Sequence, residues 1–80
     1  MNSENKINLY AFLHNKYDNL SKSNINVIDK NMYKYKADKY KNKFYNLSGG
    51  RLNINDPAVL ENGKFEYKAM KYEYKLNQLQ

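Results

Sequence analysis

The chain lacks several residue types that particular classes of protein require. It has no cysteine, no tryptophan, one proline and one histidine among 80 residues. Without cysteine there is no disulfide scaffold and no thiolate zinc site. The single histidine cannot supply the second imidazole of a typical metal centre. We therefore expect no metal site and no cofactor.

Long apolar segments are also missing. No run is long enough to cross a bilayer, so we expect no transmembrane segment. The N-terminal residues 1–6 lack the basic start and apolar stretch of a signal peptide, so we expect no secretion signal.

Tyrosine and lysine are abundant instead. There are nine tyrosines, and 14 basic residues against eight acidic ones give a formal net charge of +6. This charge attracts phosphate backbones, anionic membranes or acidic proteins without choosing between them. A domain of this size buries only about 60% of its unfolded surface. Because tyrosine suits half-wet surfaces, we expect a thin core and at least one partner surface.

The stretch 33–50 carries the clearest helical pattern. Its apolar residues follow the spacing i, i+4, i+7, i+11 and i+14, which places them on one face of an α-helix. Lysines flank this stripe, and Gly49 and Gly50 predict a left-handed cap at its end. The stripe residues are Tyr33, Ala37, Tyr40, Phe44 and Leu47.

Two helices are predicted before residue 48. Residues 3–21 form the first, with Ser3 as its N-cap, and residues 25–47 form the second, beginning near Ile25 or after Asp29. The second helix is apolar on two sides, which is typical of a helix between two neighbours. Its second apolar side consists of Ile25, Ile28, Met32 and Tyr35.

The last third predicts a connector at 48–63 and a helix at 64–79. Asp56 and Pro57 would begin a short helical turn, and Asn62 with Gly63 would end it. One long helix from Pro57 onward is the alternative. We disfavour it, because a glycine inside a helix costs about 1 kcal/mol.

Residues 65–79 repeat the pattern of residues 33–47 at an offset of 32. Seven aligned positions are identical, and we interpret the match as an internal repeat rather than as biased composition. The identical pairs are Tyr35/Tyr67, Lys36/Lys68, Ala37/Ala69, Lys39/Lys71, Tyr40/Tyr72, Lys43/Lys75 and Leu47/Leu79.

The two copies are expected to pack against each other, in the antiparallel direction that sequential helices favour, although charge alone leaves a parallel pair open. Glutamates in the second copy would then face one lysine flank, with Lys41 and Glu73 best placed. The other flank would form one basic ridge. This ridge would consist of Lys36, Lys39, Lys43, Lys68, Lys71 and Lys75.

Catalytic constellations are scarce. His14 and Asp18 lie one helical turn apart and could act as a base and its orienting carboxylate, but such a pair is usually an exposed helical pair. We therefore expect the chain to have no enzymatic activity. The basic ridge favours nucleic acid as a second partner, bound without base readout, since Arg51 is the only arginine.

The segment 39–50, preceded by Tyr33–Lys36, resembles a short motif rich in tyrosine and lysine that ends in Gly-Gly. This motif recurs in many otherwise unrelated proteins of nucleocytoplasmic large DNA viruses, especially mimivirus-like ones. The resemblance implies a viral protein and a virion component, with no enzymatic activity attached. It also implies proteolytic processing after Gly50 as an alternative role for the glycine pair.

Together these patterns predict one small all-α domain over residues 1–80, with three main helices and a short helical turn in the connector. We expect a non-enzymatic structural or interaction protein, in a virion or the host cytoplasm, that docks on a larger assembly or self-associates. A nonspecific nucleic-acid-binding protein and a small inhibitor of a host protein are the alternatives. The expected partner-binding residues are Tyr33, Tyr40, Phe44, Phe65, Tyr72 and Leu76.

Overall fold

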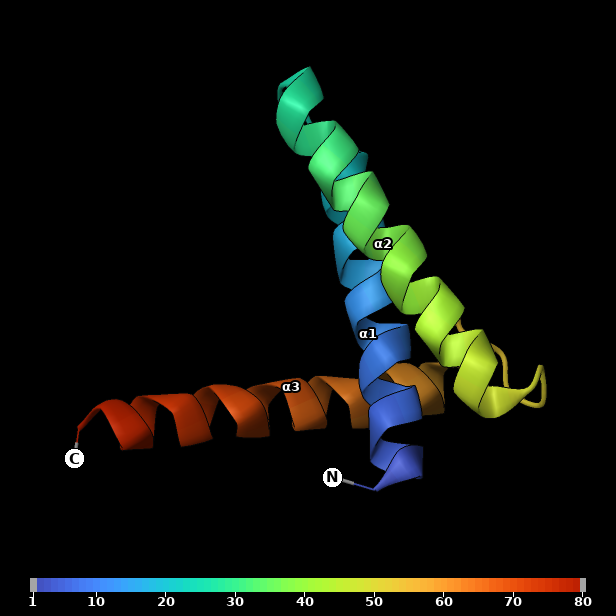
Figure 1. Cartoon of the computed structure of the whole chain (residues 1–80), viewed down its shortest axis with the longest axis vertical. Coiled ribbons are helices and arrows are strands. Elements are labelled where there is room, and N and C mark those ends of the chain that lie inside the picture. Colours follow the sequence, from blue (N-terminus) through green and yellow to red (C-terminus); the bar gives the residue numbers. More distant parts are fainter. Residues whose placement is uncertain (1, 80) are drawn as a thin grey trace.

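The computed structural model describes residues 2–79, which contain three α-helices and no strand. The helices are α1 (Ser3–Ser21), α2 (Val27–Ser48) and α3 (Pro57–Gln78). α1 and α2 run side by side in opposite directions, whereas α3 crosses them steeply and its C-terminal half extends away from both (Figure 1). The all-α class expected from the sequence is confirmed.

Asparagine side chains begin the first two helices. Asn2 accepts a hydrogen bond of 2.8 Å from the Asn5 amide, so the expected cap, Ser3, is the first residue inside α1. Asn26 accepts a bond of 2.8 Å from the Asp29 amide. α2 therefore begins at Val27, between the two starts that the sequence left open.

The glycine cap at the end of α2 is confirmed. Gly49 has a φ of 61° and donates its amide to the Tyr45 carbonyl at 2.9 Å, and Gly50 has a φ of 78°. Both conformations lie in the left-handed region, which glycine adopts without the steric cost of a Cβ atom. α2 thus ends at Ser48, one residue later than expected.

The third helix is longer than predicted. Asp56 caps it by accepting a bond of 2.9 Å from the Ala58 amide, and the helix continues from Pro57 through Gly63 to Gln78. The predicted break at residues 62–63 is wrong, and the disfavoured long helix is the one that forms. Val59, which does not fit the later apolar stripe, is buried against the core instead.

Gly63 continues the helix because α3 crosses α1 at this point. A Cβ atom on Gly63 would lie 2.1 Å from the backbone oxygen of Asn8 and 2.7 Å from Cβ of Phe12. Only glycine permits this approach between the two backbones. The close packing offsets the low helix propensity of glycine, which explains why reasoning from propensity placed a helix end here.

α1, rather than α2, is the helix between two neighbours. Both α2 and α3 pack on it, and no Cα atom of α2 lies within 8 Å of one in α3. The predicted pairing of the two repeat copies, with Lys41 against Glu73, is therefore wrong. The core lies where α1, the end of α2, the connector and the start of α3 converge. Its buried residues are Ile7, Ala11, Phe44, Ile54 and Val59.

We expect Gly63→Ala to destabilise the fold by about 1–3 kcal/mol, the usual cost of overpacking. At an exposed helical position the same change would instead stabilise the fold by up to about 1 kcal/mol. A loss of stability therefore indicates that α3 crosses α1 closely at Gly63. Urea unfolding measures it. The matched control is Asn62→Ala at the exposed neighbouring position, which should raise stability by up to about 0.7 kcal/mol through helix propensity. Equal stability of Gly63→Ala and the wild type would contradict the close approach.

Candidate functional site

Four tyrosines form a stacked ladder between α1 and α2. The rings alternate between the helices in the order Tyr10, Tyr40, Tyr17, Tyr33. Successive ring centroids are 5.9, 5.9 and 6.0 Å apart, and the interplanar angles do not exceed 27°. Stacked aromatic pairs contribute roughly 0.5–1.5 kcal/mol each beyond the area they bury. The ladder therefore joins α1 to α2 along a surface that stays partly open to solvent.

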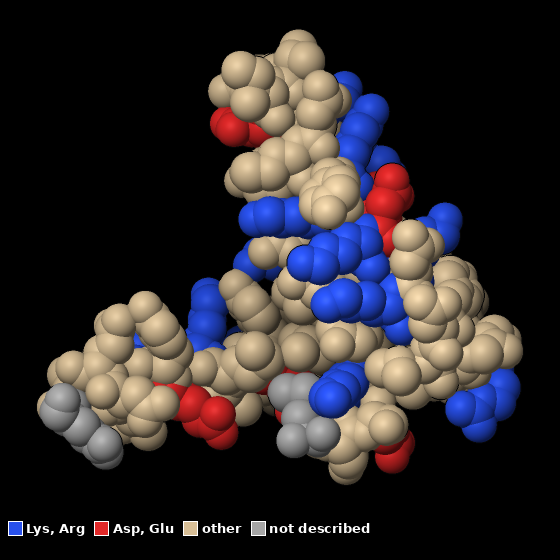
Figure 2. All heavy atoms as spheres, viewed as in Figure 1, with Lys and Arg blue, Asp and Glu red and all other residues tan. Residues whose placement is uncertain are grey.

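Lysines surround this ladder. Nζ of Lys36 lies 5.2 Å from the Tyr17 ring centroid, Nζ of Lys43 lies 5.4 Å from that of Tyr10, and Nζ of Lys39 lies 5.7 Å from that of Tyr40. These distances suit cation–π attraction. Figure 2 shows the basic side chains gathered along the arm that α1 and α2 form.

The corner between α1 and α3 holds a second tyrosine–lysine contact. Lys16 on α1 donates a hydrogen bond to the Tyr67 hydroxyl on α3, and Nζ of Lys71 lies 4.8 Å from the Tyr67 ring centroid. The Lys16 hydrogen bond is the main cause that lowers the pKa of Tyr67, and Lys71 adds to the effect. The Phe12 ring also packs against the Tyr67 ring, with 5.3 Å between the two ring centroids.

The six predicted partner-binding residues have different environments. Phe44 is fully buried in the core, so its ring is not available to a partner. Tyr33 and Tyr40 are half-buried in the ladder. The three residues of the second copy are exposed: Phe65 by 59%, Tyr72 by 68% and Leu76 by 59%.

The six predicted ridge lysines do not form one continuous ridge. Three of them surround the tyrosine ladder on α2, as described above. The other three border a shallow groove on α3 together with Tyr72; these are Lys68, Lys71 and Lys75. The two sets are separate because α1, and not α3, covers the apolar stripe of α2.

A second exposed apolar surface lies at the start of α2. Val27, Ile28 and Tyr35 are 71%, 81% and 72% exposed, and Met32 is exposed as well. The sequence predicted Ile28, Met32 and Tyr35 on this side, with a neighbour to cover them. The fourth predicted member, Ile25, lies before the start of α2 and is half-buried, and Val27 takes its place. Within residues 2–79 no helix packs there, because α3 lies on the far side of α1. We call Val27, Ile28, Met32 and Tyr35 the α2 face.

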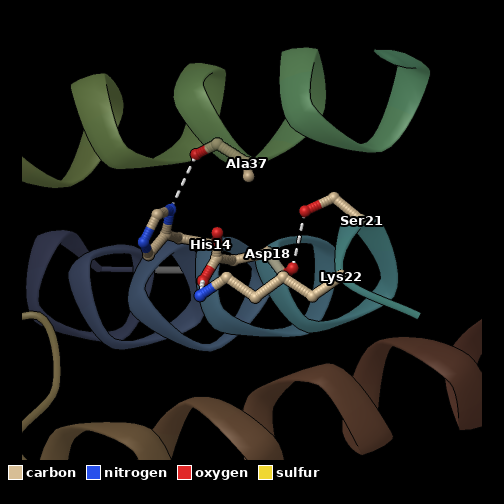
Figure 3. Close-up of polar contacts among 5 residues, drawn as sticks. All are labelled: His14, Asp18, Ser21, Lys22 and Ala37. Atoms are coloured by element: carbon tan, nitrogen blue, oxygen red, sulfur yellow. Dashed lines mark hydrogen bonds and ion pairs between the residues drawn. The ribbon is translucent and has the colours of Figure 1, made fainter. Parts of the chain in front are cut away.

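His14 and Asp18 each contact a different group, and no hydrogen bond between them is found within residues 2–79. His14 Nδ1 lies 2.8 Å from the Ala37 carbonyl oxygen on α2, where it joins two helices (Figure 3). Asp18 instead forms an ion pair of 3.0 Å with Lys22. Each side chain thus has a structural contact, and neither is aimed at the other.

Metal-binding geometry is likewise not found in the part of the chain that is described. No three histidine, cysteine, aspartate or glutamate side chains come together there. A groove of about 540 Å³ separates α1 from the first turns of α3, but it is open, and its apolar walls include Phe12, Leu20 and Leu60. None of the three helices is both long and apolar enough to cross a bilayer over residues 2–79.

The glycine pair lies next to a hydrogen-bonded turn. The Arg51 amide and Nε both donate to the Ser48 carbonyl, at 3.2 and 2.9 Å. Gly49 and Gly50 are exposed, and they act as the helix cap. Processing after Gly50 stays a prediction from the viral resemblance.

Sequence reasoning missed the contribution of α1 to this site. Tyr10, Tyr17 and Lys16 complete the ladder and the corner, yet none was singled out as a site residue. A signal was present, since Tyr10 and Tyr17 have the same seven-residue spacing as Tyr33 and Tyr40. Equal spacing on two antiparallel helices allows the rings to interdigitate.

Comparison of the chain with family models, curated proteins and solved structures found no match.

We expect Tyr67 to ionise at a lower pH than an ordinary tyrosine, because the Lys16 and Lys71 ammonium groups favour its phenolate. Since the folded-state pKa lies below the unfolded value, this group adds stability as pH rises towards 10.0, and the gain is lost as pH falls through the folded pKa. An NMR titration of the Tyr67 ring, identified by Tyr67→Phe, measures the shift.

Lys16→Met should return the Tyr67 pKa towards its ordinary value. Lys22→Met is the control, because Lys22 pairs with Asp18 instead. A Tyr67 titration that is identical in Lys16→Met and the wild type would show that the contact between α1 and α3 does not form in solution.

Proposed function

We propose that this chain is a non-enzymatic interaction protein that docks on a larger assembly, such as the virion of a large DNA virus. The observation that carries the proposal is the presence of two exposed apolar helix surfaces, the α2 face and the outer side of α3. Exposed large apolar side chains that share one helix face mark interaction sites more often than scattered ones do. The resemblance of residues 33–50 to the viral motif supports the choice of assembly.

The α2 face suits a helix or a groove of a partner protein. Ile28, Met32 and Tyr35 have the spacing i, i+4 and i+7 with which an amphipathic helix enters an apolar groove. Lys34 borders this face, and Lys39 continues its line one turn beyond Tyr35. Both are exposed, so the border of this face is basic. An apolar groove with an acidic rim is therefore the partner surface that we infer.

The test is retention of solubilised virion proteins of a mimivirus-like virus on the immobilised full chain. We expect one or a few of them to bind, and Ile28→Asp to weaken that binding at least tenfold, because it places a charge in the centre of the contact. The substitution should not harm folding, since Ile28 is 81% exposed and an acidic residue is favourable in the first turn of a helix.

Lys41→Gln is the matched control for this experiment. It lowers the net charge by one, as Ile28→Asp does, at an exposed position on the same helix but on a side away from the α2 face, and should leave binding unchanged. If no virion protein is retained, or if Ile28→Asp binds as well as the wild type, the proposed docking role of the α2 face is wrong.

Nonspecific nucleic-acid binding is a second candidate function, because the lysines beside the ladder have no acidic partners. Within residues 2–79 the one salt bridge joins Asp18 and Lys22. Lys16, Lys36 and Lys43 therefore keep charges that can contact phosphates. The tyrosine faces are covered by one another and by these lysines, so phosphate contact, and not base stacking, is the mode that this arrangement favours.

Binding to duplex DNA of mixed sequence should then fall steeply with salt. For about four phosphate contacts, affinity drops roughly a hundredfold between about 50 and 200 mM salt. The double substitution of Lys36 and Lys43 by alanine should reduce this slope. The matched double substitution of Lys34 and Lys41, on the other flank of α2, should reduce it less. Absence of binding at about 50 mM salt would eliminate this candidate.

A further inference from the structure

The outer side of α3 carries an apolar seam with the spacing of a coiled coil. Its residues alternate at intervals of four and three, so that Ala69 and Leu76 occupy a positions of a heptad and Phe65, Tyr72 and Leu79 occupy d positions. All five are exposed, Leu79 by 84%. We call these five residues the α3 seam.

The α3 seam faces away from the rest of the molecule. At 3.6 residues per turn, Gly63 and Tyr67 lie on the opposite side of α3, and these residues contact α1. A second helix can therefore approach the seam without meeting α1. The C-terminal half of α3 extends into free space in Figure 1, which agrees with this geometry.

The internal repeat shows what such a seam does when it is covered. The matching residues of α2 lie against α1, where Ala37 and Phe44 are buried and Tyr33 and Tyr40 are stacked. The copy in α3 has the same spacing, but within residues 2–79 no other helix covers it. The pattern that binds one helix to another is therefore present twice in this chain. The copy in α2 is covered by α1, and the copy in α3 is exposed.

The charges beside the α3 seam favour a second copy of α3 in parallel. Glu66 and Glu73 occupy e positions, and Lys68 and Lys75 occupy g positions. In a parallel pair the g position of one helix meets the following e position of the other, which places Lys68 beside Glu73 of the second copy, twice by symmetry.

The antiparallel alternative brings like charges together. It places Lys68 against Lys75 and Glu66 against Glu73 of the second copy. The parallel pair also has an unfavourable contact, between Glu66 and Glu61 of the second copy, which likewise occurs twice by symmetry, at the N-terminal edge of the seam. Glu61 borders the groove beside α1, and therefore lies outside the extended half of α3.

We propose that the chain forms a parallel homodimer through the α3 seam, as a short two-stranded coiled coil. The inference rests on the proposed function as an interaction protein and names the occupant of one of its two surfaces, which leaves the α2 face for the other partner. Because the seam spans only about two heptads, the interface is small, and we expect a dissociation constant of roughly 10–100 µM.

Sedimentation equilibrium of the full chain from about 10 µM to 1 mM tests the dimer. We expect Leu76→Asp to raise the dissociation constant at least tenfold. Tyr74→Asp is the matched control, since Tyr74 is 65% exposed but lies on the opposite side of α3, and it should leave dimerisation unchanged. Circular dichroism checks that both variants keep their helices. A wild type that stays monomeric throughout, or equal effects of the two variants, would overturn the proposal.

Charge exchange tests the parallel direction. Lys68→Glu places two glutamates side by side in the parallel pair and should weaken it several-fold, and the added substitution Glu73→Lys should restore the affinity. In an antiparallel pair Lys68→Glu would face Lys75 and strengthen the dimer, which would overturn the parallel arrangement.

The dimer and the proposed docking function can fail separately. If Ile28→Asp loses virion-protein binding and the wild type is monomeric, the dimer proposal is wrong and the docking proposal stands. A dimer that Leu76→Asp disrupts, without any virion protein bound, would do the reverse.

Discussion

The close crossing between α3 and α1 is the contact on which the rest of the structure depends. α2 and α3 both pack on α1 and their backbones stay apart, so α1 and the small core at the connector set the relation between them. At the crossing, the missing side chain of Gly63 brings the α3 backbone against Asn8. Tyr67, one turn later, then reaches Lys16, and the end of α3 is directed into solvent with its seam uncovered.

Local signals in the sequence were sufficient for the helices and insufficient for their arrangement. Helical periodicity predicted the apolar stripe of α2, and the left-handed cap at Gly49 follows from glycine alone. Gly63 shows the limit. Its conformational cost is local, whereas the packing that offsets this cost comes from Asn8 and Phe12, far earlier in the chain. No local pattern distinguishes a glycine that ends a helix from one that lets a helix cross another.

The internal repeat explains why the partner-binding residues were only partly predicted. Equal spacing in α2 and α3 suggested equal roles, yet the choice of neighbour is made by α1. Tyr10 and Tyr17 interdigitate with the tyrosines of α2, so Tyr40 becomes part of an internal contact, while its counterpart Tyr72 stays exposed. Spacing defines what a helix face can bind. The side chains of α1 then decide which of the two similar faces is covered.

The extended half of α3 links stability to association. The radius of gyration is 13.6 Å, against about 12 Å for a compact chain of this length, because this half of α3 lies outside the core. A helix without tertiary contacts has little stability of its own, and the segment after Tyr67 has few. Any partner that binds only the helical form therefore also stabilises it, by an amount that grows with partner concentration. Covering the seam would order the end of α3 and bury apolar surface in the same step, which is why the unpaired repeat copy is the most informative surface of this protein.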